Sequence, residues 1–336
     1  MLRIPNLADV LPSSDQDFLY LSNVSPKDKP WDKHRSESDL VSKSYRFLEY
    51  DSYAQRIENC SRYLEFALRP DVHGQVKFKL NHAFFCRVRF CPVCQWRRSL
   101  KWRARILEAV PKLLASYPSH RFIFLTLTVQ NCPLEELRAS VTHINKSWGR
   151  LVKRSKFPAV GWLKSLEVTR GRDGNAHPHL HVMLMVKASY FKGTNYLSQK
   201  RWSELWKSCL RVDYQPVVDV RLVKPKSGSS ENSVTVYVSS IKKAIVEVVK
   251  YSVKEADLTD DPLWLKGLTN QLHKTRSVAV GGVFKDYMSS KEPEDLVHTD
   301  FEDDETLDEI AKAYFAWVQK VRRYKSINFL TEEETK

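Results

Sequence analysis

The run His177-Pro178-His179-Leu180-His181, which continues through Val182-Met183-Leu184-Met185 to Val186, decides how the rest of the sequence is interpreted. In a β-strand, alternate side chains point to opposite faces, so the three histidines share one face and apolar residues occupy the other. Neighbouring imidazoles at the end of an apolar strand suit a divalent metal ion. The alternative is a surface strand with a chance cluster of histidines.

The segments around this run have the composition of one mixed domain. Residues rich in β-branched and aromatic side chains predict strands at 122–129, 161–170, 178–187 and 217–223, with a further strand at 234–238. Apolar residues at helical spacing predict helices at 51–68, 133–153, 199–209 and 240–255. The turn-rich residues 171–175 predict a hairpin between the second and third strands. This order predicts an α+β fold on an antiparallel sheet.

Three of the six cysteines form a close cluster, Cys86-x4-Cys91-x2-Cys94. Cysteines two residues apart can place both thiolates on one tetrahedral zinc ion. A fourth ligand is then needed, for which Cys60 is the best candidate and His82 the second. Close spacing in an intracellular chain of this size favours a metal over disulfides, and buried free thiols are the alternative. We therefore expect a structural Zn²⁺ site.

A basic helix is expected directly after the cysteine cluster, at residues 95–110, with Pro111 at its end. The chain has a formal net charge of +14, and nucleic acid is the commonest partner of such a surplus. The alternative is an ordinary solvated helix face. The basic residues expected to contact DNA phosphates are Arg87, Arg89, Arg97, Arg98, Lys101 and Arg105.

The helix expected at residues 240–255 carries three polar residues that come together. Residues four apart on a helix are neighbours, so Glu247 and Tyr251 share one face and Lys254 lies close to both. Apolar residues occupy the other side of this helix. A tyrosine in such a position is usually a half-buried packing residue, so Tyr251 acquires meaning only together with the other motifs.

Taken together, these motifs resemble those of HUH endonucleases. The stretches Phe124-Leu-Thr-Leu-Thr128, His177-Pro-His-Leu-His-Val-Met-Leu184 and Lys250-Tyr-Ser-Val-Lys254 look like motifs I, II and III of that superfamily. They are most similar to the single-tyrosine replication initiators of rolling-circle plasmids, whose cysteine-rich zinc region the residues around Cys60 and Cys86 also resemble. The likeness spans about residues 58–258, and the order of the motifs is more specific than any one of them.

The resemblance implies a set of roles for individual residues. His179 and His181 would hold a divalent cation, Mg²⁺ or Mn²⁺, against the scissile phosphate. Tyr251 would be the nucleophile that forms a 5′-phosphotyrosine and frees a 3′-OH. Glu247, four residues earlier, would activate water for termination. Lys254 would neutralise phosphate or phenolate charge, although a solvated lysine is an equal alternative.

A third metal ligand is also needed, and Glu167 on the partner strand is the candidate. Residues directly opposite in an antiparallel pair share a face, so the length of the hairpin loop decides. A two-residue turn at 173–174 would set Glu167 opposite Leu180, on the wrong side. A three-residue loop would set it opposite His181 and a five-residue loop opposite His179. We expect an odd loop, with His177 as the alternative ligand or a DNA contact.

Composition and the resemblance together divide the chain into four parts. Residues 1–50 would be a polar, loosely attached leader, 51–118 a zinc-binding and DNA-contacting region, 119–258 the HUH endonuclease core, and 259–336 a C-terminal extension. Ten acidic residues lie between Glu292 and Glu309. The extension is then expected to form an amphipathic helix, which packs on the protein or else binds a partner. Its apolar stripe is Leu307, Ile310, Ala311, Tyr314, Trp317, Val318 and Val321.

The leading hypothesis is therefore a plasmid rolling-circle initiator that nicks one strand at a double-strand origin. An HUH transposase or relaxase and a non-catalytic, zinc-containing DNA-binding repressor are the alternatives. The expected partner is single-stranded or hairpin origin DNA, with host helicase and polymerase as family-level expectations and a homodimer left open. No apolar run of about 18 residues and no signal peptide is present, so we expect a cytoplasmic protein without a membrane contact.

Overall fold

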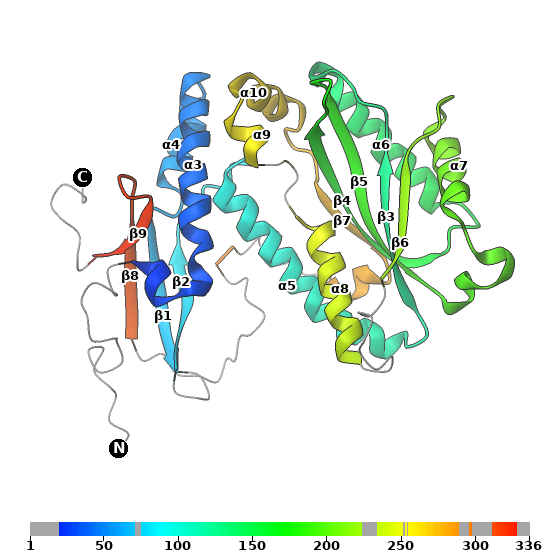
Figure 1. The fold of residues 1–336 in the computed structure, drawn as a ribbon, viewed down its shortest axis with the longest axis horizontal. Helices are drawn as coiled ribbons and strands as arrows, with labels where there is room; N and C mark the ends of the chain where they lie inside the picture. Colours follow the sequence, from blue (N-terminus) through cyan, green and yellow to red (C-terminus); the bar gives the residue numbers. More distant parts are fainter. Residues whose placement is uncertain are drawn as a thin grey trace. The chain divides into compact units, whose positions relative to one another are not determined.

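The computed structural model describes residues 20–70, 75–223, 234–250, 253, 255–288, 296–297 and 311–327 (Figure 1). The chain divides into two compact units. The first contains Met1–Lys101, Leu258–Pro262 and Glu294–Lys336, and the second contains Trp102–Asp257 and Leu263–Pro293. This division differs from the four parts expected from the sequence, because the N-terminal residues, the cysteine cluster and the C-terminal residues belong to one unit.

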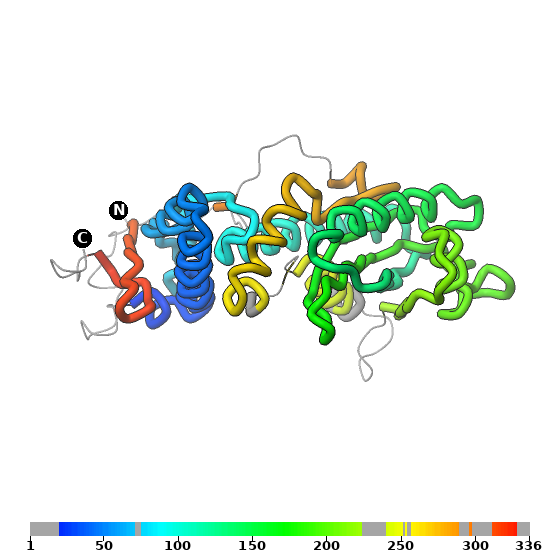
Figure 2. Tube along the Cα trace, turned by 90° about the horizontal axis from the view of Figure 1, so that it is seen from above, coloured from blue at the N-terminus to red at the C-terminus, as the bar shows by residue number. Residues whose placement is uncertain are grey.

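The first unit is built on a four-stranded antiparallel sheet with the strand order β2-β1-β8-β9. These strands are β1 (Tyr63–Pro70), β2 (Val76–Ala83), β8 (Ala311–Val318) and β9 (Arg323–Ser326). The helical elements of this unit are α2 (Leu21–Val24), η1 (Pro26–Asp28), α3 (Pro30–Phe47), α4 (Asp51–Asn59) and the first part of α5 (Pro92–Ser116). Figure 2 shows the red C-terminal strands beside the blue N-terminal helices. The Trp317 indole donates to Asp39, and the Tyr324 amide donates to Asp32.

The prediction of an amphipathic helix in the C-terminal extension is wrong. Residues 311–318 form strand β8, which pairs with β1 so that Leu64 lies opposite Phe315. The last four residues of β8 are all buried, as expected for aromatic and apolar residues in a covered strand. The partner strand lies about 250 residues earlier in the sequence, so local periodicity could not reveal the pairing. Leu307 and Ile310 lie outside the described residues, and Val321 lies in the turn after β8.

The described part of the N-terminal leader is also not loosely attached. Helix α3 buries Trp31, Val41 and Tyr45 completely. The Trp31 ring stacks on Phe85 and meets the Trp96 ring edge-on, on either side of the cysteine cluster in the sequence. The helix predicted for residues 51–68 is likewise too long, because α4 ends at Asn59 and β1 begins at Tyr63. Residues 1–19 lie outside the described part of the chain.

The second unit is built on a five-stranded antiparallel sheet with the order β6-β3-β5-β4-β7. Its strands are β3 (Arg121–Thr128), β4 (Ala159–Arg170), β5 (Ala176–Val186), β6 (Val218–Leu222) and β7 (Val278–Gly282). The first four confirm the strands predicted at 122–129, 161–170, 178–187 and 217–223, and β4 and β5 form the predicted hairpin. The α+β fold on antiparallel sheets is therefore confirmed.

Helices cover both faces of this sheet (Figure 1). On one face, α8 (Val234–Val248) and the second half of α5 pack against alternate residues of β3, β4 and β5, including Phe122, Leu163 and Met183. On the other face lie α6 (Leu137–Val152) and α7 (Gln199–Leu210). The remaining elements are η2 (Leu134–Glu136), η3 (Ala188–Phe191), η4 (Gly193–Asn195), α9 (Glu255–Thr259), α10 (Pro262–Gln271) and α11 (Phe284–Met288).

Two helix boundaries differ from the expectation because of this packing. Helix α5 does not end at Pro111 but continues to Ser116. Its buried residues Val110 and Leu113 flank the proline in the core, so packing outweighs the hydrogen bond that the proline cannot make. Residues 234–238 begin helix α8 and do not form a strand. Among the described residues, no helix is long and apolar enough to cross a membrane.

The buried side chain of Lys164 predicts a pH-dependent stability. Burial and the charge of Arg276 lower the pKa of Lys164 to about 8, and its ammonium donates to Asn145. The unfolded chain therefore binds more protons than the folded one between pH 8 and the ordinary lysine value, so the free energy of unfolding rises with pH across this window. At pH 7 we expect Lys164→Met to stabilise the protein by about 1–3 kcal/mol after loss of the hydrogen bond. Urea unfolding at pH 7 and pH 10 measures this, and the gain should shrink at the higher pH.

Candidate functional site

A carboxylate and two imidazoles meet at one end of the β4–β5 hairpin. Nε2 of His181 lies 2.7 Å from Oε2 of Glu167, and Nε2 of His179 lies 3.3 Å from the same oxygen. All three residues are buried, with exposed fractions of 5% for Glu167 and 7% for each histidine. One ligand atom from each lies within 4.8 Å of the other two. The sequence-predicted ligands are thus brought together around a single oxygen atom.

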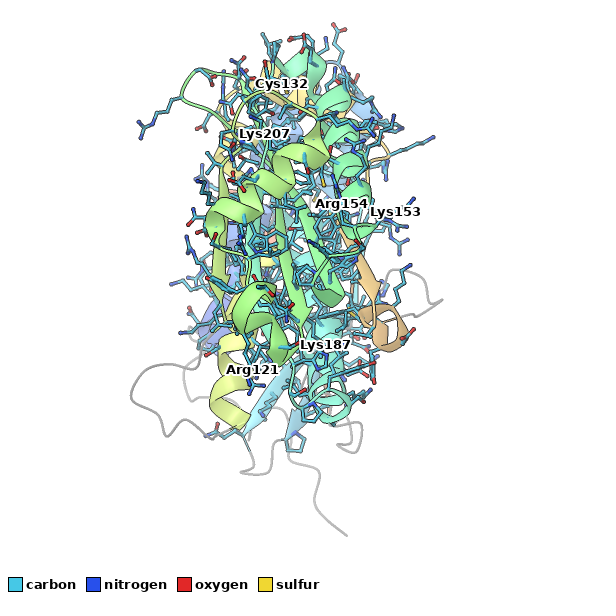
Figure 3. The ribbon with its side chains drawn as sticks, turned by 90° about the vertical axis from the view of Figure 1, so that its right-hand side faces the viewer. Arg121, Cys132, Lys153, Arg154, Lys187 and Lys207 are labelled. Atoms are coloured by element: carbon cyan, nitrogen blue, oxygen red, sulfur yellow. The ribbon has the colours of Figure 1, made fainter. Side chains whose placement is uncertain are left out.

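The register of the hairpin produces this arrangement. Arg170 pairs with Ala176, which leaves a five-residue loop, and Glu167 lies opposite His179. This is one of the two odd loop lengths that place the carboxylate on the histidine face. The backbone of Cys132 forms an isolated β-bridge with Ala176 at the start of β5. The histidines therefore lie near the end of the sheet where Figure 3 labels Cys132, and away from the end with Arg121 and Lys187. His179 and His181 lie on the same face of β5 as Met183 and Met185, which belong to the apolar core formed with α5 and α8.

Hydrogen bonds on the far side of each ring fix the orientation of the two imidazoles. Nδ1 of His179 lies 3.1 Å from the carbonyl oxygen of His177, to which it can only donate. Nδ1 of His181 lies 3.3 Å from the hydroxyl of Thr126 on β3. A metal ion bound beside Glu167 would take the place of the Nε2 protons that the rings share with this carboxylate, and with the remaining proton on Nδ1 each Nε2 atom would be a ligand. Thr126 is a supporting residue that the sequence did not single out.

The charges around Glu167 keep it ionised. Burial alone would raise the pKa of its carboxyl group, but hydrogen bonds from His179 and His181 and the charge of Lys250 hold the pKa below its ordinary value. Two neutral imidazoles and one carboxylate are a donor set typical of divalent transition metals, with open positions for substrate. The buried, convergent donors therefore fit a divalent cation such as Mn²⁺, and they would be its ligands.

His177 lies beside this group without joining it. Its Nδ1 lies 2.6 Å from the side-chain oxygen of Asn131, whose amide nitrogen lies 3.2 Å from both oxygens of Asp173 in the hairpin loop. Burial and the nearby His179 lower the pKa of His177, which favours a neutral ring donating to Asn131. We infer that His177 braces the hairpin and that Glu167 is the better third ligand.

The end of helix α8 brings a further pair of charges to the same place. Nζ of Lys250 lies 2.7 Å from Oε1 of Glu247 and 3.6 Å from Oε2 of Glu167. Glu247 is thus linked to the candidate metal-binding group by Lys250, a residue that the sequence reasoning missed. Its three-residue spacing from Glu247 could have revealed it. Burial would lower the pKa of Lys250, but its hydrogen bond to Glu247 and the charge of Glu167 raise it. Tyr251 and Lys254 lie outside the described residues.

In the first unit, the structure gathers four buried cysteines. Sγ of Cys94 lies 3.6 Å from that of Cys60 and 3.6 Å from that of Cys86, and Sγ of Cys91 lies 3.7 Å from that of Cys60. Zinc–sulfur bonds of about 2.3 Å in a tetrahedron would set sulfurs about 3.8 Å apart, so the cage fits Zn²⁺. The backbone amides of Cys86, Arg87 and Val88 also point at these sulfurs. His82 lies on β2 and is not in the group.

Three of the six basic residues expected to contact DNA, Arg97, Arg98 and Arg105, donate to backbone carbonyl oxygens. The guanidinium group of Arg97 is buried and donates to the carbonyl oxygens of Leu296 and Val297 at 2.8 and 2.6 Å. That of Arg105 donates to the carbonyl oxygen of Met288. Both groups therefore fix distant parts of the chain within their own units. Arg98 donates to the carbonyl oxygen of Arg87 at 3.2 Å. The exposed or half-buried residues Arg87, Arg89, Arg98 and Lys101 stay candidates for contact with DNA.

The comparisons with known proteins agree on one family. The model described as "Replication protein" matches residues 77–325. "Protein rep" of Streptococcus pneumoniae serotype 2 (strain D39 / NCTC 7466) is 36% identical over 304 residues, covering 87% of this chain and 90% of the relative. "Protein rep" of Bacillus amyloliquefaciens is 31% identical over 343 residues, covering 93% and 98%. "Protein rep" of Lactiplantibacillus plantarum is 35% identical over 292 residues, covering 82% of this chain and 88% of the relative.

No solved structure gives a significant match. Since the family model and the relatives cover most of its length, the chain belongs to the replication protein family.

Proposed function

We propose that this protein initiates rolling-circle replication of a plasmid by nicking one strand at the double-strand origin. The observation that carries the proposal is the convergence of His179, His181 and Lys250 on Glu167, in a chain of the replication protein family. Lys250 immediately precedes Tyr251 in the sequence, so the residue before the proposed nucleophile contacts the proposed metal-binding group.

The chemistry assigns each residue one task. A divalent cation, Mg²⁺ or Mn²⁺, bound by Glu167, His179 and His181 would polarise the scissile phosphate and orient it. The phenol oxygen of Tyr251 attacks phosphorus, the bond to the 3′ oxygen breaks, and a 5′-phosphotyrosine and a 3′-OH result. The phosphodiester energy is retained in this linkage, so the strand can be rejoined at termination. Lys254 is proposed to neutralise charge during the transfer.

Formation of a covalent adduct tests the proposal. A single-stranded oligonucleotide spanning the origin is labelled at either end and incubated with the full-length protein and Mn²⁺, then resolved on a denaturing gel. The label on the 3′ end of the DNA should migrate with the protein, because the downstream fragment carries the 5′-phosphotyrosine. EDTA should prevent this. Tight DNA binding without any adduct would instead support the non-catalytic repressor, and adduct formation at a transfer origin or transposon end a relaxase or transposase.

Replacement of Glu247 by alanine should separate the nicking step from the release of the DNA adduct by water. We expect Glu247→Ala to nick origin DNA, because the nucleophile is intact, but to retain the adduct, because no carboxylate activates the water that releases it. The adduct should persist at least about tenfold longer than in the wild type, a typical effect for loss of a general base. The measurement is the decay of the labelled adduct after a chase with unlabelled DNA.

The matched control is Glu204→Ala, which removes an exposed carboxylate from helix α7 in the same unit. Its adduct should decay at the wild-type rate. Wild-type decay in Glu247→Ala would remove the proposed role of Glu247 while leaving the nicking proposal intact.

A further inference from the structure

One ammonium group stands between the two carboxylates of the site. Nζ of Lys250 is within 2.7 Å of Glu247 and 3.6 Å of Glu167, and its side chain is 36% exposed. The Glu167 oxygen that it approaches, Oε2, is the one that both histidines also approach. Lys250 therefore approaches Glu167 from the side where a bound cation would lie.

The position of Lys250 is set by the backbone and not only by its own flexible side chain. The hydroxyl of Ser165 donates to the carbonyl oxygen of Val248, the last residue of helix α8. Ser165 lies on β4 two residues before Glu167 and points to the same face of the sheet. This hydrogen bond attaches the helix end to the strand that carries the metal-binding carboxylate. Lys250 follows two residues later and is held within reach of it.

An ammonium group and a divalent cation near one carboxylate oxygen repel each other. At a half-buried site this repulsion is larger than in bulk water, because the effective dielectric constant is lower. Glu247 offers the ammonium group a second acceptor, which draws it away from Glu167. Removing Glu247 would leave Lys250 with Glu167 as its nearest carboxylate, and removing Lys250 would leave Glu167 without a competing ammonium group.

We propose that Lys250 is a positioning residue that competes with the metal ion for Glu167 and keeps only its hydrogen bond to Glu247 when the ion binds. The bound state then has Lys250 holding the Glu247 carboxylate beside the metal site. The effect on metal affinity stands on the geometry alone. The consequence for DNA release, which Glu247 would catalyse, rests on the proposed function.

The test is a titration of the zinc-loaded, full-length protein with Mn²⁺, with free Mn²⁺ followed by electron paramagnetic resonance. We expect Lys250→Met to bind Mn²⁺ about fivefold more tightly, because it removes the competing charge. We expect Glu247→Gln to bind it about threefold more weakly, because Lys250 then turns to Glu167. The double variant should match Lys250→Met, since Glu247 acts on the metal through Lys250, and Lys250→Arg should resemble the wild type.

The matched control is Lys243→Met, which removes one positive charge from an exposed position on the same helix and should leave Mn²⁺ affinity unchanged. Equal tightening by Lys243→Met would show a general charge effect and overturn the proposal. So would unchanged affinity in Lys250→Met, or weakening by Glu247→Gln that persists in the double variant. These affinities are measured without DNA, so a failure of the proposed nicking activity would be seen separately, as absence of the adduct.

Discussion

Tyr251→Phe should abolish the covalent adduct between protein and origin DNA. The substitution removes one oxygen atom and keeps the ring, so the size and shape of the side chain change little while the only proposed nucleophile is lost. Loss of a nucleophile that forms a covalent intermediate typically costs several orders of magnitude in rate, here at least about 10³-fold. The measurement is the labelled adduct on a denaturing gel, with Mn²⁺ at saturation.

Tyr196→Phe is the matched control, because Tyr196 is an exposed tyrosine of the same unit, 47% accessible, and is not among the candidate metal ligands Glu167, His179 and His181. It should form adduct at the wild-type rate. Binding of Mn²⁺ and of origin DNA should also survive in Tyr251→Phe, which separates loss of chemistry from loss of fold. An adduct from Tyr251→Phe would assign the nucleophile to another residue and would remove the single-tyrosine mechanism.

The convergence of Glu167, His179 and His181 could be predicted from the sequence because it depends on short-range patterns. The alternation of His179 and His181 with apolar residues places both rings on one face of a strand whatever the rest of the chain does. The position of Glu167 could be predicted only with one further fact, the length of the hairpin loop. Turn-rich residues at 171–175 allowed several lengths, and only an odd one brings the carboxylate to the histidine face.

The supporting residues could not be predicted because they come from segments that are not neighbours in the sequence. Thr126 reaches His181 only because β3 and β5 pair in one register out of several. Asn131 meets His177 across a loop, and the backbone of Val248 is held by Ser165. None of these residue types is distinctive on its own. The long-range pairing that places them also explains why β8 was mistaken for a helix, since its partner β1 lies at the other end of the chain.

Loss of one cysteine from the proposed zinc cage should have the second large effect. Cys91 is fully buried, and its sulfur lies among those of Cys60, Cys86 and Cys94. We expect Cys91→Ser to lose its zinc, from one ion per chain to none, because three thiolates with a buried hydroxyl no longer form a tetrahedral thiolate site. The free energy of unfolding should fall by at least about 3–5 kcal/mol, because metal binding at a structural site contributes directly to folding. Metal analysis and urea unfolding measure the two effects.

The other two buried cysteines provide the control. Cys132 and Cys209 lie in the second unit, away from the cage in the sequence, and Cys132→Ser should keep one zinc ion per chain. Because the sulfurs of the cage come from the first unit and the proposed metal ligands His179 and His181 from the second, Cys91→Ser should weaken DNA binding before it changes Mn²⁺ affinity. Full zinc content in Cys91→Ser would contradict the cage. Equal zinc loss in Cys132→Ser would show that the metal depends on general folding and not on the four convergent sulfurs.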